Sequence, residues 1–341
     1  MLKEVIRESE VFLKVKDLKT YFHINGTTVK AVEGVHFSLK KGKVLGIIGE
    51  SGSGKSVTSR SIMRIIESPG YIEGGEILFK GEDLLKVNEK RMRQIRGNEI
   101  SLIFQDPTTS FNPYMKIGSQ LKEAYLVHKK GAPKKEAYNK ALEVLKLVGI
   151  TNGEEVMKKY PSDFSAGFRQ RIFIAMSMIL SPDILIADEP TTSLGITIQA
   201  EIIEELSKVQ KETGISIIII THDFGVVSQF SDDIFVMYAG RCVEFSPKRE
   251  LLLNPKHPYT VGLIQSVPLL EARKTKRLKS IPGFPPNMSD LPPGCAFAPR
   301  CPYAQDICAK EVPQLAEMGE NHFCACHFPL TYRTDEDTVL E

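Results

Sequence analysis

Residues 39–56 read LKKGKVLGIIGESGSGKS, and this stretch decides the fold. The apolar run 44–48 predicts a buried strand, and the apolar residues at 62, 63, 65 and 66 predict a helix beyond the glycine-rich turn. The turn matches in full the phosphate-binding loop, or P-loop, of pattern G-x-x-x-x-G-K-S. Strand, loop and helix in this order predict an α/β fold with a P-loop nucleotide-binding core.

Each part of the loop has a chemical role. Its glycines leave successive backbone N–H groups free to curl round the β-phosphate without a Cβ in the way. We expect Lys55 to reach the β- and γ-phosphate oxygens and the Ser56 hydroxyl to bind Mg²⁺, while the next helix points its positive end at the phosphates. The predicted nucleotide-binding residues here are Gly49, Glu50, Ser51, Gly52, Ser53, Gly54, Lys55, Ser56 and Val57.

Two further apolar runs, DILIADEP at 183–190 and ISIIIITHD at 215–223, are rich in β-branched residues and predict strands covered on both faces. Apolar residues between them recur at helical spacing, which predicts a βαβ unit with parallel strands whose carboxyl ends meet at one edge. Asp188 at the end of the first strand is expected to hold Mg²⁺, and Glu189 to orient or deprotonate the attacking water. His222 closes the second strand.

The composition excludes several classes of protein. In 341 residues, 44 basic side chains nearly cancel 42 acidic ones, so neither a bulk nucleic-acid binder nor a polycationic membrane coat is expected. The longest apolar run, 172–180, is about half a membrane span, and the N-terminal MLKEVIRESE lacks the apolar stretch of a secretory signal. We expect a cytosolic protein whose six cysteines are not a disulfide scaffold.

The composition changes near residue 245. Of the 20 prolines, 13 follow this point, and seven lie between Pro282 and Pro302, where a regular helix or central strand is excluded. The predicted domains are therefore residues 1–245 and an irregular Cys/Pro-rich extension, 246–341. Within the first, residues 106–165 are predicted to be a helical insertion, with one amphipathic face that Gly149 ends. This face contains Ala137, Ala141, Leu145 and Val148.

The order of the motifs resembles that of the ABC-transporter ATPases. Gln105 in IFQDP is similar to their Q-loop, which senses Mg²⁺ and the transmembrane partner, and FSAGF at 164–168 is similar to their signature loop. The resemblance implies a RecA-like P-loop NTPase core with a helical subdomain. It also implies that the nucleotide contacts Ser165 and Gly167, that His222 contacts the γ-phosphate, and that Phe22, or its neighbour Tyr21, stacks on adenine. The catalytic residues are then Lys55, Glu189 and His222.

A narrower resemblance covers about residues 11–330. The segments IADEPTT (186–192), TIQAEI (197–202), HPYTVGLIQSVP (257–268) and PGCAFAPRCPYAQDIC (293–308) look like the dipeptide/oligopeptide (and nickel) permease subfamily. This implies an ATPase that powers peptide import at the cytoplasmic face of the membrane. Its implied partners are a sister ATPase, in a heterodimer, two membrane permease subunits and, indirectly, an extracytoplasmic substrate-binding protein. The sequence does not distinguish among four classes of substrate: dipeptides, oligopeptides, nickel chelates and oligosaccharides.

The extension contains a cysteine pattern with the spacing C-x5-C-x6-C and a fourth cysteine beyond a longer loop. Four thiolates suit either an iron–sulfur cluster or structural zinc, and the resemblance implies [4Fe–4S]; free thiols are the third reading. Cys324 and Cys326 both fit the fourth position, since residues two apart on an extended chain face the same side. The family pattern favours Cys326, and Cys242 is expected to be buried. The predicted ligands are Cys295, Cys301, Cys308 and Cys326.

Two positions depart from the family pattern. The signature has Ala166 where the family has glycine, and the D-loop reads Ser193-Leu194-Gly195, without its usual aspartate. A Cβ at 166 would crowd the γ-phosphate or, if the glycine required φ > 0, cost about 1–2 kcal/mol. The hypothesis is asymmetry, in which this chain's P-loop site hydrolyses ATP and the site completed by FSAGF is slower. Neutral drift is the alternative.

Two other functions compete with transport. A soluble ABC ATPase acting on nucleic acid is disfavoured because the chain has one P-loop, no sustained heptads and no basic stripe. A nucleotide-binding scaffold whose catalysis has lapsed is disfavoured by the intact Glu189 and His222, and is mildly favoured by the altered signature.

Overall fold

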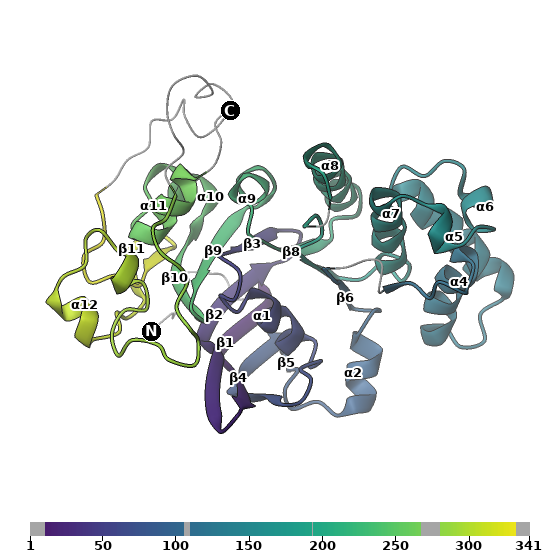
Figure 1. Ribbon diagram of the computed structural model, residues 1–341. Coiled ribbons are helices and arrows are strands. Elements are labelled where there is room, and N and C mark those ends of the chain that lie inside the picture. The colour runs from purple at the N-terminus through teal and green to yellow at the C-terminus, as the bar shows by residue number, and fades with distance from the viewer. Residues whose placement is uncertain (1–10, 106–109, 193, 267–279, 332–341) are drawn as a thin grey trace, which may run out of the picture. The chain divides into compact units, whose positions relative to one another are not determined.

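The computed structural model describes residues 11–105, 110–192, 194–266 and 280–331 (Figure 1). The chain folds into two compact units. Unit 1 comprises Met1–Lys40, Val44–Leu85 and Thr221–Glu341, and unit 2 comprises Lys41–Lys43 and Lys86–Ile220. Unit 1 therefore combines the beginning and the end of the chain, and the division into residues 1–245 and 246–341 stays a prediction.

An antiparallel sheet of unit 1 begins with a long hairpin. β1 (Val11–Ile24) pairs with β2 (Thr27–Lys40) through a two-residue turn, and on its other edge with β4 (Gly70–Phe79), which also pairs with β5 (Glu82–Asp83). The turn residues Asn25 and Gly26 have φ of 50° and 79°, the left-handed conformation that tight hairpins require. The sheet keeps one face buried because Leu13 and Val15 alternate with polar residues.

The P-loop strand of unit 1 is β3 (Val44–Ile48), and all five of its residues are buried. It runs parallel to β9 (Asp233–Tyr238). β9 then pairs antiparallel with β10 (Arg241–Pro247), β10 with β12 (His322–Cys324), and β12 with β11 (Ala316–Gly319). A strand buried on both faces confirms what the apolar run 44–48 predicted. It carries the P-loop at its carboxyl end, directly before α1 (Lys55–Ile62).

The C-terminal extension packs into the core of unit 1. α10 (Lys248–Leu253) and α11 (Pro258–Gln265) contribute Leu251 and Tyr259, which are completely buried, and Phe297 joins them against residues of β9 and β10. Residues 282–302, all of them described, contain a single turn of 3₁₀ helix, Ala298–Arg300, and no strand. The proline-rich stretch is therefore irregular, as predicted, and α12 (Asp306–Lys310) is the short helix that follows it.

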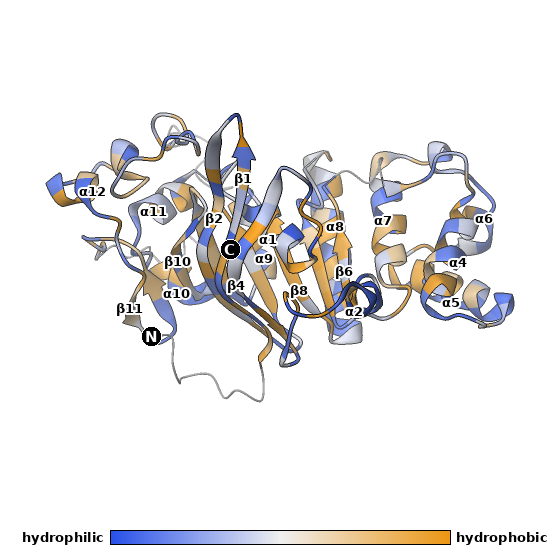
Figure 2. Ribbon diagram, turned by 90° about the horizontal axis from the view of Figure 1, so that it is seen from below, coloured by the Kyte–Doolittle hydropathy of each residue, from blue (hydrophilic) through white to orange (hydrophobic). Residues whose placement is uncertain are grey.

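Unit 2 contains a parallel sheet. β6 (Ile100–Ile103) pairs with β7 (Ile184–Asp188), and β7 with β8 (Ser216–Thr221), all in parallel. The strands are buried throughout, and Figure 2 shows β6 and β8 in the orange of apolar residues. α8 (Ile196–Thr213) connects β7 to β8, which confirms the predicted βαβ unit.

A group of helices completes unit 2 (Figure 1). α2 (Glu89–Ile95) precedes β6, and α4 (Ile117–His128), α5 (Lys134–Leu147), α6 (Gly153–Val156) and α7 (Ala166–Ser177) follow it. α5 contacts α4, α6 and α7. The predicted apolar face of α5 is buried, and Gly149 follows the helix with φ of 75°.

No helix in the described part of the chain has both the length and the apolar composition that a membrane span requires.

Candidate functional site

The P-loop backbone has the conformation that its glycines allow. Gly52 and Gly54 have φ of 79° and 100°, where L-residues are strained. A Cβ on Gly49 would lie 2.2 Å from the carbonyl oxygen of Met237, and one on Gly54 would lie 2.3 Å from that of Ala31. At 49 and 54 the loop therefore has no room for any other residue.

Lys55 folds back over the loop. Its side chain is 4% exposed, and Nζ donates to the carbonyl oxygens of Gly49 at 2.7 Å and Glu50 at 3.0 Å. The hydroxyl of Ser53 is buried and has no hydrogen-bond partner among the described residues. Buried polar atoms are usually paired, so this hydroxyl suits a phosphate oxygen as its partner.

The other predicted residues of this segment lie at the start of α1. The carbonyl of Ser56 accepts a hydrogen bond from the Ser59 hydroxyl at 2.9 Å, and that of Val57 accepts one from the Ser61 hydroxyl at 2.7 Å. Ser51 and Gly52 are exposed at the tip of the loop. The loop thus presents accessible backbone N–H groups at a helix N-terminus, where an anion is favoured.

The two aromatic candidates for adenine stacking differ in their surroundings. Tyr21 is 9% exposed, and its hydroxyl donates to Glu33 at 2.9 Å; burial and this carboxylate raise the pKa of Tyr21 to about 12. Phe22 is half-buried and lies against Gly70, where an added Cβ would come within 2.5 Å of its ring. Phe22 is the more accessible ring, and its role stays a prediction.

His222 is exposed in unit 1, between β8 and α9 (Phe224–Phe230). The next residue, Asp223, caps α9 by accepting a hydrogen bond from the backbone N–H of Gly225 at 2.8 Å. This cap fixes the backbone that carries His222, because it satisfies one of the N–H groups that a helix N-terminus leaves unpaired.

The acidic residues lie in unit 2, at the carboxyl end of β7. Asp188 is 2% and Glu189 is 9% exposed. Glu189 has φ of 48°, and its Oε2 accepts hydrogen bonds from Gln105 Nε2 at 3.2 Å and from the Thr192 hydroxyl at 2.7 Å. A non-glycine residue at positive φ stores strain, which is typical of functional positions. The resemblance predicted Gln105, and the apolar strand that ends in two acids predicted Glu189, but nothing in the sequence signalled Thr192.

The signature loop FSAGF opens α7. The Ser165 side chain accepts a hydrogen bond from the Phe168 backbone N–H at 3.3 Å, as an N-cap. Ala166 is the first residue of this helix and therefore has helical backbone, so the expected cost of a positive φ does not arise at this position. Gly167 is buried, and a Cβ there would lie 2.5 Å from Ile198 Cγ2 of α8. The close approach of α7 and α8 thus requires this glycine.

The structure describes Leu194 and Gly195 of the D-loop, the segment that departs from the family pattern. Gly195 precedes α8 with φ of −67°, and an added Cβ would meet nothing within 4 Å. Glycine is therefore not required at this position, and an aspartate would fit. Ser193 lies outside the described residues, as do residues 106–109 of the predicted helical insertion.

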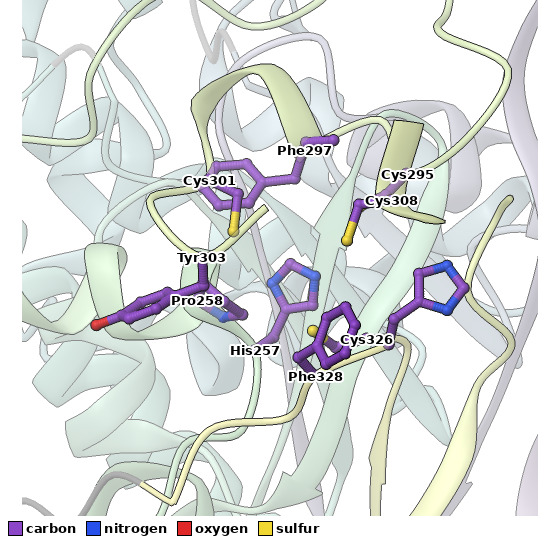
Figure 3. A pocket seen from close by; sticks show the side chains of 11 residues that line it. His257, Pro258, Cys295, Phe297, Cys301, Tyr303, Cys308, Cys326 and Phe328 are labelled. Carbon is purple, nitrogen blue, oxygen red and sulfur yellow. The ribbon is translucent and has the colours of Figure 1, made fainter. Parts of the chain in front are cut away.

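Four cysteines of the extension line one pocket of unit 1 (Figure 3). They are the four predicted ligands, Cys295, Cys301, Cys308 and Cys326. Cys324 is fully buried on β12 at the register position of Glu244, and it is absent from the pocket lining. Strand parity could not separate Cys324 from Cys326, because β12 ends at residue 324 and the extended alternation that parity assumes does not continue to residue 326.

The pocket has soft donors and apolar walls. It is also lined by His257, Pro258, Phe297, Ala298, Tyr303, His327 and Phe328. Burial raises the pKa of the Cys295 and Cys301 thiols, and raises that of Cys326 to about 11, so these thiols are protonated near neutral pH. Among the described residues, no three or more His, Cys, Asp or Glu side chains are already gathered as a metal-ion site. The four sulfur donors nonetheless match the ligand set of an iron–sulfur cluster or of structural zinc.

An unpredicted ion pair joins the extension to the P-loop. Arg300, which lies between Cys295 and Cys301 in sequence, donates to both carboxylate oxygens of Glu50, at 2.6 and 2.9 Å. The Arg300 side chain is only 6% exposed, and the Glu50 carboxylate raises the pKa of the guanidinium. Residues 250 apart give no local signal, so no sequence pattern pointed to this pair.

Two family models match the chain. The model "ABC transporter" matches residues 32–192, and the model "Oligopeptide/dipeptide transporter, C-terminal region" matches residues 243–308. Among curated proteins, the oligopeptide transport ATP-binding protein OppD of Bacillus subtilis is 48% identical over 91% of this chain and 87% of its own length. The dipeptide transport ATP-binding protein DppD of the same organism is 48% identical over 93% of this chain and 94% of its own.

Solved structures match the fold of the cassette. A bacterial ABC transporter cassette solved as a dimer has a TM-score of 0.62 at 24% identity, covering 70% of this chain and 99% of that one. The cbiO1 protein from Clostridium perfringens, part of a cbiONQ ABC transporter complex, has a TM-score of 0.61 at 29% identity, covering 71% and 90%.

Proposed function

Because the chain belongs to the ATP-binding subunits of the oligopeptide/dipeptide ABC transporters, we propose that it hydrolyses ATP to drive the import of di- or oligopeptides. Membership confirms the resemblance and the predicted ABC ATPase fold. The observation that carries the proposal is the 48% identity over more than nine-tenths of the chain, together with a complete P-loop.

The P-loop residues are proposed to bind the phosphates. Backbone N–H groups of the loop hold the β-phosphate, and Lys55 exchanges the carbonyl oxygens of Gly49 and Glu50 for β- and γ-phosphate oxygens. Ser56 and Asp188 are the proposed ligands of Mg²⁺, assisted by Gln105. Mg²⁺ neutralises charge on the phosphates when it is bound.

Glu189 is proposed to orient the attacking water and to accept its proton. Gln105 and Thr192 hold its carboxylate by hydrogen bonds, so the orientation of the carboxylate is already fixed before the reaction. His222 is proposed to contact the γ-phosphate, and Phe22 to stack on adenine. Catalysis then consists mostly of positioning and charge neutralisation.

The partners are proposed from the family. They are a sister ATPase, whose signature loop completes the site on this P-loop, and two membrane permease subunits that receive substrate from an extracytoplasmic binding protein. Ser165 and Gly167 are proposed to complete the partner's site in the same way. The chain would therefore work as a peripheral protein on the cytoplasmic face of the membrane.

The two ATP sites are proposed to be unequal. The site on this chain's P-loop keeps its lysine and both carboxylates, whereas the site completed by FSAGF meets Ala166 in place of glycine. Gly195 removes a carboxylate near the dimer interface of the family. The support is the sequence itself, since Ala166 adds a Cβ to the signature loop and Gly195 lacks the carboxylate, although the open space around Gly195 would admit an aspartate.

The extension is proposed to hold a [4Fe–4S] cluster, with zinc as the alternative. Four cysteines line one pocket, and all four donors are sulfur, which both of these centres accept. Loading must release protons, because metal-bound thiols are deprotonated and burial raises the pKa of Cys295, Cys301 and Cys326. Absorbance of the purified protein near the thiolate-to-iron band, together with metal analysis, separates iron–sulfur from zinc and from free thiols.

The proposed function is tested with the purified chain and its sister subunit. The pair is expected to bind MgATP and hydrolyse it, and with the permease pair in liposomes it is expected to drive uptake of peptide. A chain that does not bind ATP in the presence of magnesium, or that associates with neither a sister ATPase nor a permease, contradicts the proposal. Binding without hydrolysis would favour the lapsed scaffold.

A further inference from the structure

Glu50 is held in place on three sides. Its carboxylate receives both arms of the Arg300 guanidinium, and its backbone N–H donates to the Tyr259 hydroxyl at 2.8 Å. Its carbonyl oxygen accepts from Lys55 Nζ at 3.0 Å and from the Ser53 N–H at 3.2 Å. The orientation of the Glu50 peptide therefore sets the resting position of Lys55, the residue proposed to bind the β- and γ-phosphates.

Arg300 has little freedom to move independently. Besides Glu50, it donates to the Pro282 carbonyl at 2.7 Å, to the Tyr238 hydroxyl at 3.2 Å and to the Gly283 carbonyl at 3.5 Å. The guanidinium lies 5.9 Å from the ring centres of Tyr238 and Phe297. Because these bonds hold a planar, buried group in one geometry, a shift of its backbone is transmitted to Glu50 rather than absorbed by the side chain.

Arg300 does not line the cysteine pocket itself, but it lies in sequence between Ala298 and Cys301, which do (Figure 3). It ends the 3₁₀ turn Ala298–Arg300, which is bounded by two pocket cysteines: the Ala298 N–H donates to the Cys295 carbonyl at 2.9 Å, and the Cys301 N–H donates to the Ala298 carbonyl at 3.2 Å. The Cys295 N–H in turn donates to the Cys308 carbonyl at 2.7 Å. A metal centre that bonds the cysteine sulfurs at about 2.3 Å fixes their positions, and hence this turn.

From these contacts we infer that Arg300 is a positioning residue that makes the affinity of the P-loop for MgATP depend on whether the four-cysteine pocket holds a metal. The connection runs from Cys295 and Cys301 through the turn to Arg300, and from Arg300 through Glu50 to Lys55. The inference rests on the proposed ATP-binding function and adds a regulatory role for the extension.

A purely structural ion pair is the competing explanation, and it predicts a different result. Removing Arg300 would then lower stability and weaken ATP binding equally in the loaded and stripped forms. A positioning role predicts that the ratio of the two affinities itself changes, because coupling is a property of both sites together. The deciding quantity is therefore the ratio of the MgATP dissociation constants of the loaded and stripped forms of one variant. A uniform loss of stability leaves this ratio unchanged.

The experiment uses the full chain, purified without oxygen. One portion is loaded with ferrous iron and sulfide, and the other is stripped with a chelator. The dissociation constant of MgATP is measured for both forms of the wild type, Arg300→Gln, Arg300→Lys and Glu50→Gln, with metal content measured alongside. Arg91→Gln is the matched control, since Arg91 forms a comparable two-armed pair with Glu99 in unit 2. Hydrogen exchange of the backbone amides of residues 49–56 measures directly whether the P-loop changes between the two forms.

In the wild type we expect loading to change MgATP affinity by about fivefold or more. Arg300→Gln and Glu50→Gln should reduce this ratio to near one while still taking up metal, Arg300→Lys should restore part of it, and Arg91→Gln should keep it. Equal affinities in loaded and stripped wild type, a wild-type ratio in folded Arg300→Gln, or failure of the chain to take up metal each overturns the coupling. Absence of MgATP binding in both wild-type forms instead refutes the proposed function.

Discussion

The side-chain amide of Gln105 donates a hydrogen bond of 3.2 Å to Oε2 of Glu189, although 84 residues separate the two. The Thr192 hydroxyl donates to the same oxygen at 2.7 Å. The carboxylate proposed as the catalytic base is thus oriented before any nucleotide binds, and Gln105, the residue proposed to sense the permease, contacts it directly. A movement of Gln105 would remove one of the two hydrogen bonds that orient Glu189.

Glu189→Gln tests this assignment. The amide keeps the size of the side chain but cannot accept a proton, so ATP hydrolysis should fall by roughly 10²–10⁴-fold while MgATP binding is retained. ATPase assays and nucleotide retention on the sister-subunit pair measure both effects. Glu204→Gln, at an exposed position of α8, is the control and should leave both unchanged. Normal turnover in Glu189→Gln would remove Glu189 from the mechanism.

Gly49→Ala tests the steric account of the P-loop. The new Cβ would lie 2.2 Å from the Met237 carbonyl oxygen, which is backbone and cannot swing away. The substitution should lower the free energy of unfolding by about 1–3 kcal/mol and abolish MgATP binding. Gly74→Ala is the matched control, because a Cβ there meets nothing within 4 Å. Thermal melts and nucleotide titrations check both, and unimpaired binding by Gly49→Ala would show that the loop adapts.

Ala166→Gly combined with Gly195→Asp tests the proposed inequality of the ATP sites. Neither change meets a steric obstacle, since Ala166 has helical backbone and Gly195 has open space around it. If the site completed by FSAGF is slow, the double variant should raise ATPase turnover of the assembled transporter by about twofold, as a second site becomes active. Ala166→Gly alone should give part of the gain. An unchanged ATPase turnover in both variants would indicate that Ala166 and Gly195 arose by neutral drift and do not slow either site.

Cys326→Ser and Cys324→Ser form a matched pair that tests the fourth ligand. Cys326 lines the pocket and Cys324 lies buried on β12, so only Cys326→Ser should lower the iron or zinc content of the purified protein. Cys324→Ser buries a hydroxyl and should cost about 1–3 kcal/mol of stability without loss of metal. Metal analysis with thermal melts measures both. The reverse pattern would reassign the ligand.

The local elements of the fold could be predicted from the sequence. Residues 44–62 fix a strand, a loop and a helix by their own chemistry, and the run from 184 to 221 fixes a βαβ unit. The same holds for Gly149 at the end of α5, because a positive φ is a local requirement. Such features depend on neighbours within a few residues, which a single sequence displays.

Features that depend on distant contacts could not be predicted. Glu50 and Arg300 meet only because the extension packs into the core of unit 1, and Thr192 is revealed as a partner of Glu189 only by the strained turn after β7. Of the two alternatives for Ala166, the cost of a positive φ does not apply, because Ala166 is the first helical residue of α7. The family pattern located Ala166 but did not give its backbone conformation.

The division of the chain has a consequence for its biosynthesis. Unit 2 is drawn almost entirely from residues 86–220, whereas unit 1 needs the first 85 residues and the segment after residue 220. A ribosome therefore releases everything that unit 2 requires while β3 still awaits β9, the strand of unit 1 with which it pairs. Until β9 has been synthesised, one edge of the apolar strand β3 lacks the strand that covers it, so a chain stalled before residue 233 is a client for chaperones and proteases.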